Sequence, residues 1–331
     1  MHTAKERMNI VVFRVLKLGD LLCTVPAFRA LRRAFPKAHI TLMGMPWAAA
    51  FVERYAAYID AFLHFPGYPG LPEQQVSLHE VQAFLTTVKK SKIDLLLQLQ
   101  GDGSIVNELL EQFGAPLLAG FCQPGDRRAA KRNFLVYPAH LHEIHRHLAL
   151  LQQLSIPAAG DELEFPLCPK DFAEFEAVKE RLPATGYLCI HPGASVPQRQ
   201  WPPRYFARLA DHFAAKGYAI VLTGTPAERA LTATVADMMR APATDLAGAT
   251  TLGSMGVLLS RAKGMVTNCT GVSHLATALK LRSVVISMDG EPHRWGPLDH
   301  QLHRTIDWTV CNDYETVVAA AERLFEDPSN S

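Results

Sequence analysis

The feature that most constrains the fold of this chain is a repeated alternation of short apolar runs with amphipathic stretches. The apolar runs have the length of buried strands, and the stretches between them show helical periodicity. Strands that alternate with helices indicate βαβ units, which place successive strands in a parallel sheet. The first half is expected to hold strands at 9–13, 39–43, 61–65, 94–99 and 117–121 and helices at 21–33, 48–55, 76–90, 104–113 and 141–154.

The alternation stops at a proline-, alanine- and glycine-containing segment, residues 157–161, and then begins again. A chain of 331 residues is long enough for two domains. We therefore expect an α/β protein with two doubly wound, Rossmann-like domains, at 1–158 and 162–312, each with its ligand at the carboxyl ends of the strands. The second domain is expected to hold strands at 187–190, 219–222, 264–267 and 283–287 and helices at 203–216, 227–239, 252–262 and 273–279, followed by a last helix at 315–326.

Composition excludes several classes of protein. Lysine and arginine number 33 against 32 for aspartate and glutamate, so no bulk charge favours nucleic acid. The six cysteines are scattered without a C-x-x-C pair, which is typical of reduced thiols in the cytosol. No apolar run reaches the ~18 residues of a membrane span. We expect a cytoplasmic protein that has no nucleic-acid partner and whose contact with a membrane is at most peripheral.

Loops rich in small residues follow three strands of the second half, at 191–195, 223–228 and 268–274. Such loops let backbone N–H groups approach a phosphate, and a helix N-terminus adds partial positive charge. For any single loop, glycine and proline that simply end a strand are an equally good explanation. Three such loops on one domain favour a nucleotide diphosphate.

In the first half, residues 14–20 join the first strand to the first helix, and Asp20 falls at or near the N-terminus of that helix. From spacing alone, an aspartate that caps the helix is the simpler explanation.

Taken together, these segments resemble glycosyltransferase family 9, the heptosyltransferase family. The resemblance runs from about residue 8 to about residue 326. The matching segments are Leu18-Gly19-Asp20, Pro26 to Arg32, His191 to Ser195, Arg199-Gln200-Trp201-Pro202, Leu222-Thr223-Gly224 with Glu228, Leu246 to Thr250, Thr270 to Ala276 and Arg294-Trp295-Gly296-Pro297.

The resemblance implies the GT-B architecture, with an acceptor domain first, a donor domain second and a C-terminal helix, 313–327, that packs back on the first domain. It implies an inverting enzyme that takes a sugar from a nucleotide diphosphate, most often ADP-heptose, and transfers it to a hydroxyl of the lipopolysaccharide core or another glycan or glycolipid. The nucleotide sugar is then a substrate, no metal or other cofactor is required, and contact with the inner membrane is peripheral.

The resemblance also implies roles for individual residues. Asp20 matches the proposed catalytic base, Arg199 stands where the family has a lysine, and Glu228 matches the glutamate that holds the ribose. The residues expected on the donor side are Ser195, Arg199, Thr223, Glu228, Thr250, Cys269, Thr270, Gly271, Val272 and His274. Those expected on the acceptor side are Arg14, Lys17, Gly19 and Asp102.

The chain departs from the family pattern at one turn, where Cys269-Thr270-Gly271 replaces Asp-Thr-Gly. A thiol is a weak partner for sugar hydroxyls, which leaves the donor sugar open. It also leaves open a second hypothesis, an inactive or weakly active scaffold that binds a nucleotide sugar. Cys269 itself is either a small filler or, beside a helix N-terminus, a reactive thiolate.

Other enzyme classes fit less well. The first strand is not followed by the G-x-G-x-x-G of nicotinamide enzymes, and Ser195 lacks the G-x-S-x-G of serine hydrolases. The histidine-rich run of His140, His142, His145 and His147 suggests a metal, but helical spacing separates it into two faces. We expect a polar helix there rather than a metal site.

Overall fold

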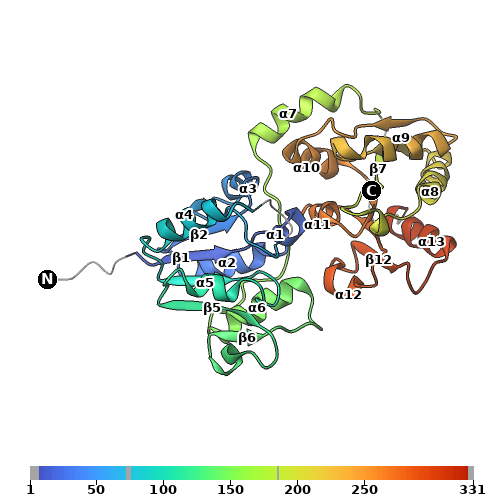
Figure 1. Cartoon of the computed structure of the whole chain (residues 1–331). Helices are drawn as coiled ribbons and strands as arrows, with labels where there is room; N and C mark the ends of the chain where they lie inside the picture. Colours follow the sequence, from blue (N-terminus) through green and yellow to red (C-terminus); the bar gives the residue numbers. More distant parts are fainter. Residues whose placement is uncertain (1–6, 72–75, 185, 327–331) are drawn as a thin grey trace. The chain divides into compact units, whose positions relative to one another are not determined.

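A computed structural model describes residues 7–71, 76–184 and 186–326 of the chain. The residues divide by contacts into two compact units, Met1–Glu162 and Leu163–Ser331. In Figure 1 the first unit is coloured from blue to green and the second from yellow-green to red. Among the described residues, no helix combines the length and the apolar content needed to span a membrane.

The first unit is built on a six-stranded parallel sheet in the order β3-β2-β1-β4-β5-β6. Its strands are β1 (Asn9–Phe13), β2 (His39–Gly44), β3 (Ala61–His64), β4 (Leu95–Gln98), β5 (Leu117–Cys122) and β6 (Phe134–Val136). Its helices are α1 (Leu18–Leu22), α2 (Val25–Ala34), α3 (Ala48–Arg54), α4 (Leu78–Val88), α5 (Asn107–Glu111), the short 3-10 helix η1 (Arg127–Ala130) and α6 (Glu143–Gln153).

Helices cover both faces of this sheet, as the alternation along β1 shows. Val11 and Phe13 lie in a core with α4 and α5, whereas Ile10 and Val12 are fully buried outside that core. A strand whose two faces are both buried needs a continuous apolar run, which is why the sequence pattern predicts it well.

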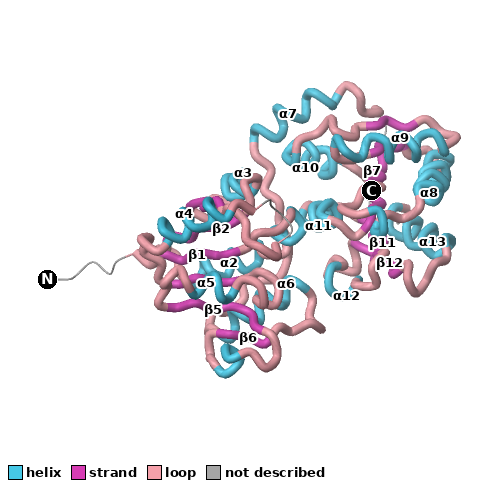
Figure 2. The backbone as a smooth tube through the Cα atoms, viewed as in Figure 1, coloured by secondary structure: helices cyan, strands magenta, loops and turns pink. Residues whose placement is uncertain are grey.

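The second unit repeats the same plan, with a parallel sheet in the order β12-β11-β10-β7-β8-β9. Figure 2 shows the strands of both units in magenta. The strands are β7 (Tyr187–His191), β8 (Ala219–Leu222), β9 (Ala243–Asp245), β10 (Gly264–Asn268), β11 (Ser283–Ser287) and β12 (His303–Asp307). The helices are α7 (Pro169–Lys179), η2 (Pro197–Arg199), α8 (Pro203–Ala215), η3 (Pro226–Glu228), α9 (Arg229–Met238), α10 (Leu252–Arg261), α11 (Gly271–Ala278), α12 (Pro292–Trp295) and α13 (Tyr314–Phe325).

The last helix, α13, buries its apolar face in the core of the second unit. Val317, Ala321 and Leu324 lie in one cluster with Leu188 of β7 and Phe213 of α8. This differs from the expected packing of 313–327 onto the first domain, because the second sheet needs a cover for this face. Residue 327 lies outside the described residues.

Three local features differ from the sequence-based expectation. The single helix expected at 21–33 is two helices, α1 and α2, because Pro26 has no N–H with which to continue the first. The short strands β6, β9 and β12 were not predicted, and each carries at least two residues that are only partly buried or exposed. Helix α7 was also missed.

In both units the strand order reverses beside the first strand, between β1 and β4 and between β7 and β10. In open α/β sheets the crevice at the carboxyl end of such a reversal is where ligands bind. Each unit therefore places one candidate site, formed by the loops that follow these strands.

Candidate functional site

In the first unit, Asp20 lies just beyond the carboxyl end of β1, in the first turn of α1. The helix begins after Lys17, whose side chain makes no capping hydrogen bond, and Asp20 is its third residue. Asp20 is therefore not the N-cap, which corrects the simpler explanation drawn from spacing. The Asp20 side chain is 24% exposed, so it is held by the protein and still accessible.

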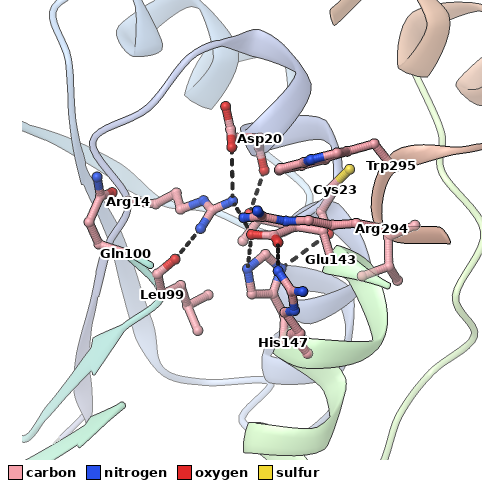
Figure 3. A network of polar contacts seen from close by, with 12 residues as sticks. Arg14, Asp20, Cys23, Leu99, Gln100, Glu143, His147, Arg294 and Trp295 are labelled. Atoms are coloured by element: carbon pink, nitrogen blue, oxygen red, sulfur yellow. Dashed lines mark hydrogen bonds and ion pairs between the residues drawn. The ribbon is translucent and has the colours of Figure 1, made fainter. Parts of the chain in front are cut away.

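The carboxylate of Asp20 rests on a buried arginine, Arg14, as Figure 3 shows. One nitrogen of Arg14, Nη2, lies 3.4 Å from Oδ1 of Asp20 and 2.9 Å from Oε1 of Glu143. The other, Nη1, donates to the carbonyl of Leu99. A cation this close favours the ionised form of Asp20.

Glu143, from the first turn of α6, is the second buried carboxylate of this cluster. Its Oε2 accepts from Nη1 of Arg146 at 2.8 Å, and its Oε1 lies 3.7 Å from Nε2 of His147. The other ring nitrogen of His147 faces the carbonyl of Cys23 at 3.3 Å. Burial lowers the pKa of His147 to about 3, so this ring is neutral and the charges of the cluster are two arginines and two carboxylates.

The loop that carries Arg14 is fixed to the segment that follows the neighbouring strand β4. Oε1 of Gln100 accepts from the N–H of Val15 at 2.9 Å, and its Nε2 donates to the Val15 carbonyl. Sequence reasoning missed Gln100, Glu143 and Arg146, and it considered His147 only as part of the histidine run. Charged residues at buried positions of the amphipathic helix α6 are a signal that could have found Glu143 and Arg146.

The residues expected on the acceptor side differ in their exposure and in their contacts. Lys17 is exposed and Gly19 is buried in α1. Arg14 is 1% exposed and contacts Asp20, so direct contact with an acceptor is not expected of it, and its place on the acceptor side stays a prediction. Asp102 follows β4 and accepts from Ser104 and Gln123. Although burial alone would raise the pKa of Asp102, these hydrogen bonds lower it.

In the second unit, the loops after β7 and β10 are held together by Asn268, which is fully buried. Its Nδ2 donates to the carbonyls of Pro192 and Gly193 at 2.7 and 3.2 Å. Its Oδ1 accepts from the N–H of Trp201 at 2.8 Å. This neutral side chain thereby connects three of the segments that the sequence singles out, and it was not itself predicted.

Glu228 lies close to two glycines of these loops. Its Oε2 accepts from the N–H of Thr225 at 2.7 Å. A Cβ on Gly193 would come within 2.1 Å of Oε1, so glycine is required there for the carboxylate to take this position. Nearby, Nδ1 of His191 lies 3.1 Å from Oγ1 of Thr223, and burial lowers the pKa of His191.

Arg199 forms an ion pair with Asp289, a residue after β11 that the sequence did not point to. The Nη2–Oδ2 distance is 3.0 Å, and the Arg199 side chain is 41% exposed. The charges of Arg199 and Asp289 also act on Cys269. Burial raises the pKa of the Cys269 thiol to about 12, and the negative charge of Asp289 acts in the same direction. Both effects favour the protonated thiol over the reactive thiolate, so the small-filler hypothesis stays the prediction for Cys269.

The turn at 269–271 leads into α11. Thr270 is the N-cap residue, and its N–H donates to Oγ of Ser273 at 3.3 Å. Gly271 and Val272 form the first helical turn, and both are partly exposed. His274 is buried, with its ring centroid 6.1 Å from that of Trp295.

The loop after β9 runs beside the Glu228 loop. The N–H of Gly248 donates to the Gly224 carbonyl at 2.8 Å, and Nε of Arg229 donates to the Ala247 carbonyl at 3.2 Å. These bonds place the loop that ends with the partly exposed Thr250 near the other donor-side segments. Ser195 is exposed on the loop after β7.

Three residues of the histidine run have other partners within the described part of the chain. His142 caps α6 by accepting from the N–H of Ile144, His145 pairs with Asp161 at 2.9 Å, and His147 is buried beside Glu143. Within residues 7–71, 76–184 and 186–326, no three His, Cys, Asp or Glu side chains gather as metal ligands would.

Comparison with solved structures defines the class of fold. A family 9 glycosyl transferase from Veillonella parvula superposes with a TM-score of 0.80 at 23% identity, over 96% of this chain and 97% of that one. The ADP-heptose lipopolysaccharide heptosyltransferase II of Escherichia coli gives 0.75 at 20% identity, over 96% and 99%. The chain has the GT-B architecture, with two Rossmann-like units.

Sequence comparison then gives the family. The sequence model of glycosyltransferase family 9 (heptosyltransferase) matches residues 81–313. Lipopolysaccharide heptosyltransferase 2 of Escherichia coli is 26% identical over 314 residues, which cover 89% of this chain and 86% of that protein. Lipopolysaccharide heptosyltransferase 1 of Pseudomonas aeruginosa is 25% identical over 300 residues, covering 82% and 76%. The chain belongs to glycosyltransferase family 9 and is a glycosyltransferase.

Proposed function

We propose that this glycosyltransferase moves a heptose from ADP-heptose to a hydroxyl of a lipopolysaccharide-core acceptor, with inversion at the anomeric carbon. The second unit binds the donor and the first unit binds the acceptor. The names of the relatives support the sugar and the acceptor class. The enzyme works in the cytoplasm and touches the inner membrane at most peripherally.

In this proposal Asp20 is the general base. The acceptor hydroxyl attacks the anomeric carbon, its proton passes to the Asp20 carboxylate, and the bond between the sugar and the diphosphate breaks with its electron pair on the leaving oxygen. The observation that carries the proposal is the position of Asp20. Its partly exposed carboxylate lies at the strand-order reversal and forms an ion pair with the buried Arg14.

The second unit stabilises the leaving diphosphate without a metal ion. Arg199 exchanges its partner Asp289 for the diphosphate, since its side chain is partly exposed. The N–H groups at the start of α11 and the helix dipole add to this, the dipole by ~0.3–2 kcal/mol. The Glu228 carboxylate accepts hydrogen bonds from the ribose hydroxyls.

The experiment is donor turnover with ADP-heptose and a panel of ADP- and UDP-sugars, measured as nucleotide release with and without core acceptor. Release that depends on acceptor and is fastest with ADP-heptose is expected, and EDTA leaves it unchanged. Loss with EDTA and recovery with a divalent ion would contradict the metal-free mechanism. Binding without release for every acceptor would instead favour the scaffold hypothesis suggested by Cys269.

A further inference from the structure

Beneath the proposed base lies a buried carboxylate, Glu143, that the mechanism above does not use. Its side chain is 3% exposed and it comes from α6, more than a hundred residues after Asp20 in the chain. A buried carboxylate is expensive unless it is paired, and Glu143 has two arginine partners, Arg14 and Arg146. Figure 3 shows it below Asp20.

The two carboxylates share one nitrogen of Arg14. Nη2 lies 2.9 Å from Glu143 and 3.4 Å from Asp20, so the shorter contact goes to the buried group. Since Nη1 is held by the Leu99 carbonyl, the guanidinium cannot turn toward Asp20 without losing a hydrogen bond. Arg14 is thus shared between two carboxylates, and its shorter contact is with Glu143.

We propose that Glu143 is a positioning residue for the transfer reaction, which holds Arg14 so that Asp20 is oriented but remains basic enough to take the acceptor proton. An arginine paired with Asp20 alone would make the carboxylate a weaker base, because an opposite charge at this distance stabilises the ionised form. This inference rests on the proposed role of Asp20 as the base.

In the first unit, charged and titratable groups that face this cluster come from four elements. They are Arg14 in the loop after β1, Asp20 in α1, Glu143, Arg146 and His147 in α6, and Tyr137 after β6, whose hydroxyl lies 2.6 Å from Nη1 of Arg146. His147 is neutral over the working range of pH, since burial lowers its pKa to about 3. It therefore contributes no change of charge to the profile described next.

The test is the pH profile of kcat with saturating donor and acceptor. In Glu143→Gln the full charge of Arg14 acts on Asp20, so the acidic limb should move to lower pH by about one unit, with a plateau kcat roughly threefold lower. The donor KM should stay unchanged. Glu111→Gln is the matched control, because Glu111 also lies between two arginines, Arg127 and Arg128, in a separate cluster.

Removing one buried charge can prevent folding, so a second variant keeps the charge balanced. Glu143→Gln/Arg146→Met removes one carboxylate and one arginine together and leaves Arg14 with Asp20. It should show the same displaced acidic limb. Folded variants with the wild-type profile, or with a kcat lowered equally at every pH, would overturn the proposal.

A double-mutant cycle separates this proposal from the one on which it rests. In the Asp20→Asn background, Glu143→Gln should reduce the residual rate less than about twofold, because the group that it serves is gone. Full additivity would show a merely structural role and overturn the inference alone. Near-normal turnover of Asp20→Asn itself would reject the base, and this inference with it.

Discussion

The two units have the same strand order and place their candidate sites at the same reversal, but different side chains build them. In the first unit the loops are fixed by buried ions, Arg14 and Glu143 with Arg146. In the second unit they are fixed by neutral Asn268, with three hydrogen bonds. The topology supplies a crevice in each case, and the polar side chains decide its chemistry.

This difference suits the two proposed tasks. A base needs a carboxylate whose surroundings control its charge, and ion pairs do that. A donor site for a diphosphate must leave its cations and N–H groups available to the ligand. A neutral residue such as Asn268 can join the loops without competing for the phosphates.

The largest effect is expected at the site of the first unit, which is built from ion pairs. Asp20→Asn should lower kcat by about 10²–10⁴, because the proton acceptor is lost. Asp126→Asn is the matched control, since Asp126 also pairs with an arginine of this unit and is similarly exposed, 22% against 24%. Comparable rates for the two variants, measured as ADP release, would reject the assignment.

A smaller effect is expected at the site of the second unit, whose loops are joined by Asn268. Arg199→Ala should weaken ADP binding roughly 10- to 100-fold, because charge-assisted hydrogen bonds to the diphosphate are lost. Adenosine binding should hardly change. Arg208→Ala, which removes another arginine paired with a carboxylate of the same unit, should leave both affinities unchanged. Equal losses for ADP and adenosine would show that Arg199 does not contact phosphate.

Each unit also contains a buried neutral histidine, which makes stability depend on pH. Burial lowers the pKa of His147 to about 3 and that of His303 to about 4. As pH falls from 6.5, the unfolded chain gains protons that the folded chain does not, so the free energy of unfolding should fall by up to ~1.4 kcal/mol per pH unit for each histidine.

Urea unfolding between pH 7 and pH 4 measures this slope. His147→Gln and His303→Gln should each flatten it. An unchanged slope in both buried-site variants would contradict the burial argument.

The smallest effect concerns Cys269. Because burial raises its pKa to about 12, the thiol is protonated at neutral pH and should react slowly with iodoacetamide, after the exposed Cys168. Cys269→Ser should change kcat by less than about threefold. Complete loss of turnover with unchanged ADP affinity would make the thiol part of the chemistry.

The sequence predicts the elements of this fold better than it predicts the contacts within the sites. Every strand expected from an apolar run is present. Central strands such as β4 and β10 are buried on both faces and need such runs. The three-residue strands β6 and β9 lie at sheet edges, where no such requirement acts. The resemblance to the family pointed to Asp20, Arg14 and Arg199, but not to the ion-pair partners Glu143 and Asp289.

Those partners are distant in the chain. Glu143 is 129 residues from Arg14, and Asp289 belongs to a different strand-end loop from Arg199. No local sequence pattern shows that a residue will form an ion pair with a residue in the loop after a different strand. Asn268 is the converse case, since it stands inside a segment that the sequence singled out, yet only its three hydrogen bonds reveal what it does.

The most direct test of the division between the two sites is calorimetric titration of ADP into the wild type, Asp20→Asn and Arg199→Ala. Asp20→Asn should bind ADP with wild-type affinity although its turnover is lost. Arg199→Ala should bind it at least tenfold more weakly. If Asp20→Asn weakens ADP binding as much as Arg199→Ala does, the division of roles between the two units is wrong.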